Sequence, residues 1–242
     1  PFDSKSRTWT LKDGVVNSSP LSGDPRPGNA KFKKLTPVDE NSANPYTLTD
    51  DDRTVIGNTT PKFSGGFGLN ATFKGFDVSA FFNFMYDFDV FNANKVMMTT
   101  WASNNYNNFS MDISAAKRWR NFDDMGNEIR YSPEILAEFN KNATMWNPTS
   151  IGRPIAMSYA VEDGSFLRLN TATIGYTLPR AWTNKVGLSR VRFYASGYNL
   201  FTITGYSGYD PEVDIATGLT PNIDNNRYPR SRTYTFGVQL TF

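Results

Sequence analysis

The residues that most resemble a catalytic pair are two carboxylates, Asp210 and Glu212, on either side of Pro211. Neighbouring carboxylates can share general acid and base work, but a Tyr-Asp-Pro-Glu stretch is also typical of a turn in a loop. Ser165 and Ser196 have no base to activate them, because the chain contains no histidine and no cysteine. Ser–His–Asp and Cys–His catalysis, His-ligated zinc and disulfides are therefore excluded. We predict that the chain is not an enzyme and needs no cofactor.

Aromatic and amide side chains gather in the region 87–164 and have the chemistry to bind a ligand. Aromatic rings stack on sugars or peptides, and amides make oriented hydrogen bonds. The candidate ligand-binding residues are Trp101, Asn105, Tyr106 and Trp146, with a second cluster at Trp119, Arg118 and Arg120. Packing within the loop and contact with a partner protein explain the same residues, so all three interpretations remain open.

The composition excludes several classes of protein. Of the 242 residues, 15% are aromatic, far more than in a disordered chain. No apolar run approaches the roughly 18 residues that a membrane-spanning helix needs. The net charge is +2, with scattered charges, which argues against a nucleic-acid partner. The chain begins without a signal peptide, so we expect either that one was removed or that the chain is a piece of something longer.

Strict alternation of apolar and polar residues predicts a long β-hairpin. Apolar residues occupy the odd positions of Phe63–Phe73 and the even positions of Phe76–Tyr86. Lys74-Gly75 lies between them as a two-residue turn. In such a hairpin Phe73 and Phe76 pair, so both apolar rows share one face.

Three further strands are predicted, over 166–178, 190–201 and 234–242. The residues 1–62 form a loop-rich segment, which we expect to be extracellular. Long loops are expected at 87–164 and 203–230, whereas the link 179–189 is short. Two short helices are expected in the first of these loops, one over 113–121 and one that starts after Ser132 with Pro133 in its first turn.

Strand length and loop length together favour an antiparallel transmembrane β-barrel. Eleven residues extend about 36 Å, and a strand tilted by about 45° then spans the apolar band of roughly 25 Å. Short turns alternating with long loops are typical of bacterial outer-membrane barrels. The alternative is a soluble β-sandwich, which buries the same apolar face against a second sheet. Five strands do not close a membrane barrel, so 63–242 would supply the C-terminal strands of a larger one.

Several ordered motifs resemble the C-terminal part of the SusC/RagA family of TonB-dependent outer-membrane transporters. In chain order, the motifs include Asp52-Arg53-Thr54-Val55-Ile56-Gly57-Asn58, Glu162-Asp163-Gly164-Ser165-Phe166-Leu167-Arg168-Leu169, Ser196-Gly197-Tyr198-Asn199-Leu200-Phe201, Gly208-Tyr209-Asp210-Pro211-Glu212-Val213 and Arg227-Tyr228-Pro229-Arg230. The resemblance covers about residues 50–242.

The resemblance implies a barrel of about 22 strands with an N-terminal plug. It further implies active import of a glycan or an oligopeptide, driven by TonB, with a SusD-like surface lipoprotein as a lid. The plug and the TonB contact would lie in the missing N-terminal part. Two alternatives remain: a passive porin or structural outer-membrane barrel, and a soluble β-sandwich that binds glycans.

The chain departs from the family pattern at one loop, which in family members often has the spacing of a calcium site. Here the loop reads Asp39-Glu40-Asn41-Ser42-Ala43-Asn44, with alanine at a ligand position and without the glycine, although Asp50, Asp51 and Asp52 follow. We therefore expect a solvated acidic loop and no metal, with calcium as the less favoured alternative.

The last predicted strand resembles the signal read by the outer-membrane barrel-assembly machinery. Its alternating apolar residues end in an aromatic ring, and they offer a pairing edge and a lipid-facing row. The residues of this signal are Tyr234, Phe236, Val238, Leu240 and Phe242. Arg168, Arg192 and Gln239 fall on the opposite, polar positions, where we expect them to face the lumen.

Overall fold

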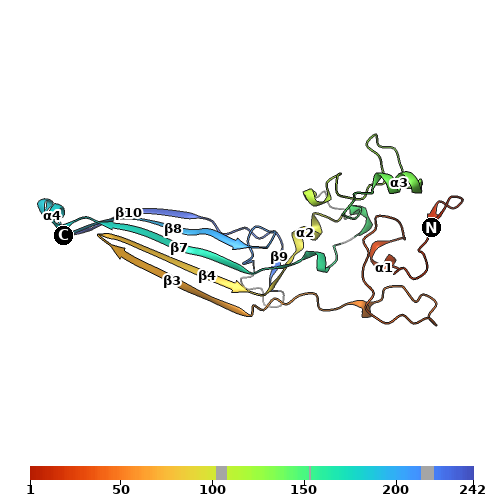
Figure 1. Ribbon diagram of the computed structural model, residues 1–242, viewed down its shortest axis with the longest axis horizontal. Helices are drawn as coiled ribbons and strands as arrows, with labels where there is room; N and C mark the ends of the chain where they lie inside the picture. Colours follow the sequence, from red (N-terminus) through yellow and green to blue (C-terminus); the bar gives the residue numbers. More distant parts are fainter. Residues whose placement is uncertain (102–107, 153, 214–220) are drawn as a thin grey trace. The chain divides into compact units, whose positions relative to one another are not determined.

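The computed structural model describes residues 1–101, 108–152, 154–213 and 221–242. Its largest element is a five-stranded antiparallel sheet in the order β10-β8-β7-β4-β3 (Figure 1). The strands are β3 (Phe63–Phe73), β4 (Phe76–Tyr86), β7 (Phe166–Thr177), β8 (Arg190–Thr204) and β10 (Thr233–Thr241). All five were predicted from the alternation, and β8 continues three residues beyond its predicted end at 201.

The β3–β4 hairpin has the predicted register, with Phe73 paired to Phe76. Lys74 and Gly75 both have positive φ, 45° and 88°. Two positive φ values define a type I′ turn, whose twist matches that of the flanking strands. The turn is also bonded to the neighbouring strand β7, because the Thr177 N–H at the end of that strand donates to the Gly75 carbonyl at 2.8 Å.

A bulge interrupts β7 and β8 two-thirds of the way from the turn end. Leu169 pairs with Phe82 and Thr171 with Phe81, so Asn170 has no partner in the β4 ladder. On the other side Leu169 pairs with Phe201 and Thr171 with Tyr198. The extra residues shift the alternation by one position. In β7, residues with odd numbers therefore lie on the apolar face before Asn170, and residues with even numbers lie on it afterwards.

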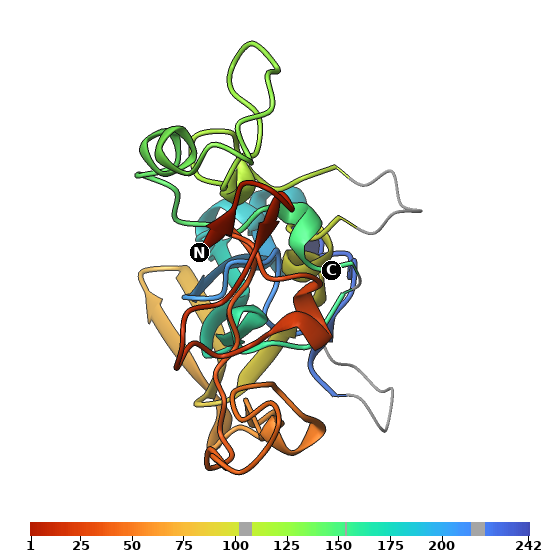
Figure 2. The same ribbon diagram turned by 90° about the vertical axis from the view of Figure 1, so that its right-hand side faces the viewer.

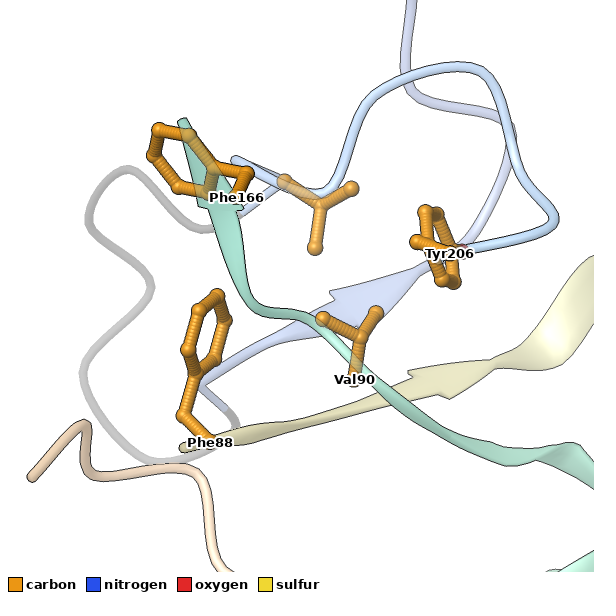
Figure 3. Close-up of a cluster of buried hydrophobic side chains, with 5 residues drawn as sticks. Phe88, Val90, Phe166 and Tyr206 are labelled. Atoms are coloured by element: carbon orange, nitrogen blue, oxygen red, sulfur yellow. The ribbon is translucent and has the colours of Figure 1, made fainter. Parts of the chain in front are cut away.

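The loop end of the sheet carries a small second sheet in the order β6-β5-β9. Its strands are β5 (Asp89–Asn92), β6 (Val161–Asp163) and β9 (Ile223–Asp224). Beside it lies a buried hydrophobic cluster of Phe88, Val90, Phe166, Tyr206 and Val213 (Figure 3). The buried Tyr206 hydroxyl donates to Asp224 at 2.7 Å, which joins the loop after β8 to β9. Burial also raises the pKa of Tyr206 well above its ordinary value.

The opposite end of the sheet carries the turns. The link between β7 and β8 folds into α4 (Arg180–Thr183) and a 3-10 helix (Asn184–Val186), drawn beside the C-terminus in Figure 1. Together with the sheet, these elements make one compact unit, Ile56–Asn92 and Val161–Phe242.

Pro1–Val55 and Ala93–Ala160 form the other compact unit, in which short helices and turns are joined by irregular segments (Figure 2). Its elements are β1 (Phe2–Asp3), β2 (Thr8–Trp9), α1 (Ser19–Ser22), α2 (Ala93–Met97), α3 (Pro133–Phe139) and 3-10 helices at Asp50–Asp52, Met111–Ile113, Pro148–Ser150 and Ser158–Ala160. Across the described ranges, no helix has the length and apolar character needed to cross a bilayer.

One of the two predicted helices is present and the other is wrong. α3 begins after Ser132 with Pro133 in its first turn, as predicted. The expected helix over 113–121 is replaced by the 3-10 helix Met111–Ile113 and a turn. The reason is that Ser114 has extended backbone, with ψ of 159°, and the Trp119 N–H donates to the Met145 carbonyl at 2.9 Å instead of to its own helix.

Candidate functional site

The strand register divides the large sheet into an apolar face and a polar face. One row of the apolar face runs through Phe67, Phe82, Leu169 and Phe201 across four strands. A second row, next to the turns, runs through Phe73, Phe76, Tyr176, Phe193 and Val238. Many of these side chains are exposed, among them Phe73 at 69%. An exposed apolar surface of this extent needs a non-aqueous neighbour.

The polar face has the opposite chemistry. A row through Asn70, Ser79, Thr173, Ser196 and Thr235 crosses all five strands. The Thr173 and Ser196 hydroxyls lie 2.8 Å apart and share a hydrogen bond. Such a surface of hydroxyls and amides suits the wall of a water-filled lumen.

Arg168 is the centre of a charged cluster on the polar face. It is only 1% exposed, and its Nη2 lies 2.5 Å from Asp210 Oδ1 and 3.6 Å from Glu212 Oε2. Arg230 contacts the other Glu212 oxygen at 2.6 Å. Asp210 also accepts from the Glu212 N–H at 3.0 Å, which fits a turn. Both carboxylates are therefore held by guanidinium groups that fix the segment after β8.

Arg192 makes a second ion pair on the polar face, close to the turns. Its Nε donates to Asp77 Oδ1 at 2.9 Å, and its Nη2 contacts the other oxygen of the same carboxylate. The guanidinium reaches Asp77 on β4 by passing over Gly175 of β7, where a Cβ atom would lie 2.4 Å from Nη2. Gln239 is the register partner of Arg192 on β10 and lies on the same face.

The predicted ligand-binding residues lie in different environments. Trp101 is 43% exposed, and its ring centre lies 5.8 Å from that of Phe109. Trp146 is half-buried and donates from Nε1 to the Thr99 carbonyl at 3.2 Å, so its indole is used in packing. Asn105 and Tyr106 lie outside the described residues.

The second predicted cluster is used in packing and hydrogen bonds. Trp119 lies against Gly28, the Arg118 guanidinium donates to the Ile113 carbonyl at 3.0 Å, and Arg120 contacts Asp124 at 2.6 Å.

The acidic loop has a structural use for one of its carboxylates. Asp52 accepts hydrogen bonds from the Thr36, Thr49 and Leu35 N–H groups at 2.8 to 2.9 Å, and it pairs with Lys34 at 3.2 Å. These hydrogen bonds hold the pKa of Asp52 far below its ordinary value, and the one from the Thr36 N–H has the largest effect. In the part of the chain that the structure describes, no three acidic, histidine or cysteine side chains converge as metal ligands would.

The predicted assembly residues share the apolar face at one edge of the sheet. Tyr234, Phe236, Val238 and Leu240 alternate along β10, and Phe242 follows the strand. All five are exposed. β10 pairs with β8 alone among the described strands, so its other edge is open.

Comparison with known proteins fits this two-faced sheet. No family model matches the sequence. The chain is 32% identical to TonB-dependent receptor P3 of Formosa agariphila over 228 residues, which are 92% of this chain and 20% of that receptor. It is 32% identical to TonB-dependent receptor SusC of Bacteroides thetaiotaomicron over 164 residues, 62% of this chain and 15% of SusC. The solved RagAB peptide transporter matches 76% of this chain and 17% of its own, with a TM-score of 0.57 and 26% identity.

The chain is SusC/RagA-like. It spans about a fifth of the length of the curated relatives that it matches. The predicted resemblance and the predicted fold class, a partial antiparallel barrel wall, are thereby confirmed. A SusC/RagA-like chain also explains the sheet, because a barrel wall has one apolar and one polar face.

Proposed function

We propose that this chain forms part of the wall of an outer-membrane importer of the SusC/RagA type, which takes up a large nutrient. One observation carries the proposal: the five-stranded sheet has a continuous apolar face and two open edges. Within the described ranges β3 and β10 each pair on one side only. Open edges are not tolerated in lipid, so further strands of the same receptor must pair with them.

The alternatives fit less well. A soluble β-sandwich needs a second sheet on the apolar face, and the described residues supply none there. A passive porin shares the barrel, but the relatives are named TonB-dependent receptors. Active import, with a plug and a TonB contact supplied by the rest of the receptor, is therefore our preferred function.

The proposed partners follow from the likeness to SusC and RagAB. A SusD-like surface lipoprotein would cap the extracellular loops, and the exposed pair of Trp101 and Phe109 is available for it or for a nutrient. The RagAB neighbour is a peptide transporter and SusC a TonB-dependent receptor. An oligopeptide and a glycan both remain candidate nutrients. We propose no nucleic-acid partner, no cofactor and no bound calcium.

The first test is a gel of outer-membrane extracts, boiled and unboiled, probed with an antibody to this chain. We expect a band far above 27.2 kDa that shifts on boiling, as a closed barrel within a larger receptor would. A soluble, unshifted band at the mass of the chain alone would contradict the proposal. Uptake of labelled peptide and glycan mixtures, with and without TonB, then separates active import from passive diffusion and identifies the nutrient class.

We also propose that the apolar row from Tyr234 to Phe242 is read by the barrel-assembly machinery. Deleting Phe242 from the receptor should lower the amount of heat-shifted barrel in the outer membrane. Unchanged assembly would contradict this role.

A further inference from the structure

A shallow groove of about 480 Å³ crosses the apolar face near the turns. Its lining includes Ala195 and the aromatic residues Tyr176, Phe193 and Phe236. The groove begins at the row of Phe76 and Tyr176, which is the row next to the turns. The groove therefore lies on the face assigned to lipid, near the turn end of the sheet.

Basic side chains that have no carboxylate partner among the described residues lie at that turn end. The connections 74–75 and 178–189 contain Lys74, Arg180 and Lys185, and no aspartate or glutamate. All three basic residues are exposed. The Lys74 ammonium lies 5.2 Å from the ring centre of Phe73, a residue of the apolar face, so this cation is on the lipid side.

The carboxylate that is closest to this turn along the chain is already used. Asp77 follows the turn by two residues, but Arg192 holds both of its oxygens on the polar face. Arg190 also lies on the polar face, paired in register with Thr241. The turn end thus keeps three cations that make no ion pair within the described part of the chain, and α4 also carries an exposed indole at Trp182, 60% exposed. Tryptophan is enriched at the boundary between lipid tails and headgroups.

We propose that this groove and the three cations form a binding site for one anionic phospholipid, in the leaflet that faces the short turns. The inference rests on the proposed function, because it requires the apolar face to be in a membrane. An acyl chain would lie over Ala195 between the rings. The headgroup phosphate would lie at Lys74, Arg180 and Lys185, where lipid-facing cations attract anionic lipids. Charge complementarity and continuity with the lipid-facing surface select this occupant.

The test uses the full-length receptor, purified with its boiling shift intact and placed in nanodiscs of equal phosphatidylglycerol and phosphatidylethanolamine. Native mass spectrometry then counts the lipids that each receptor retains. We expect preferential retention of phosphatidylglycerol. The triple variant Lys74→Gln, Arg180→Gln and Lys185→Gln should retain about a hundredfold less of it, because each cation near the headgroups contributes about fivefold.

Two further variants make the test specific. Ala195→Phe fills the groove without touching the charges, and it should lower retention of both lipids. The matched control Lys12→Gln, Lys31→Gln and Lys33→Gln removes three exposed charges from the other compact unit, and retention should not change.

The outcomes separate the two proposals. Loss of the boiling shift in the unmutated receptor would overturn the proposed function and the lipid site with it. An intact shift with no preference for phosphatidylglycerol, or with full retention by the triple variant, overturns the lipid site alone. If the triple variant fails to fold, Ala195→Phe decides, since unchanged retention in that variant also overturns the site.

Discussion

At the scale of single residues, the polar face is organised by two arginines, Arg168 and Arg192. The alternation alone places Arg192 on a polar position, whereas Arg168 has the parity of Ala172 and Ile174 and reaches the polar face because of the bulge at Asn170. Their partners were not predictable, because Asp210 is 42 residues away from Arg168 and Asp77 is 115 residues away from Arg192. A periodic pattern assigns a side chain to a face, whereas an ion pair depends on which distant segment returns to that face.

Arg168 is expected to fix the segment 205–213. Replacing it with glutamine leaves Asp210 and Glu212 without their buried cation, and losing one partner of a buried pair costs about 3–5 kcal/mol. We expect Arg168→Gln to raise hydrogen exchange in 205–213 strongly. Arg230→Gln is the matched control, since Arg230 contacts the same Glu212 but is 38% exposed, and it should have little effect. Equal exchange in the two variants would contradict this role.

Asp52 is expected to make its loop sensitive to acid. Its pKa is lower in the folded protein than the unfolded value of about 3.9. The stabilisation is therefore complete above that value and is lost as the pH falls below it. Hydrogen-exchange protection of the Leu35, Thr36 and Thr49 amides should be constant from neutral pH down to about 4 and decline further down. Asp52→Asn should weaken the protection of these amides at neutral pH and remove its decline in acid. The control Asp51→Asn should leave the protection and its decline unchanged. An unchanged pH profile in Asp52→Asn would refute the assignment.

At the scale of elements, the long strands were predictable and the short helices were only partly so. Strands such as β3 and β4 alternate strictly because successive side chains lie on opposite faces of the sheet, one apolar and one polar. The segment 113–121 has no such repeating environment, and its backbone follows contacts with Met145 and Ser110. The bulge at Asn170 was also not predictable, because it shows only when the neighbouring strands are aligned.

The β3–β4 turn is expected to depend on one glycine. Gly75→Ala places a Cβ at a φ of 88° and 2.8 Å from the Thr177 carbonyl. The left-handed backbone alone costs roughly 1–2 kcal/mol for a residue with a Cβ. We expect the receptor to lose its compact form at a lower temperature in unboiled gels. Gly68→Ala is the control, since its nearest contact would be an ordinary 3.7 Å; equal losses in both variants would show that the turn geometry is not responsible.

At the scale of the whole molecule, composition and patterning predicted a barrel wall. They did not predict that the segments 1–55 and 93–160 fold together into one compact unit, because no periodic pattern in the sequence marks this association. It depends on single contacts, such as Trp119 over Gly28 and the Asn147 N–H on the Gly28 carbonyl. Of the candidate binding residues, the pattern could not distinguish the accessible Trp101 from the packed Trp146.

The two faces of the sheet make a prediction for neighbouring residues. Leu69 lies on the apolar face and Asn70 on the polar face of the same strand. Leu69→Arg should reduce the heat-shifted barrel in the outer membrane, because an arginine near the middle of the lipid layer costs about 2–4 kcal/mol. Asn70→Arg adds the same charge on the lumen side and should assemble normally. Normal assembly of both variants would mean that the apolar face does not meet lipid.

The ion pair that passes over Gly175 has a mechanical consequence. It joins β4 to β8 across the intervening β7, over a glycine. Sliding β4 against β8 by one register step, two residues or about 7 Å, would pull the guanidinium from the carboxylate. Sliding β7 by the same step would bring a threonine side chain under the guanidinium in place of Gly175. The contact therefore resists shear along the strand direction, and a tensile load on one strand is shared with its neighbours before the backbone hydrogen bonds yield.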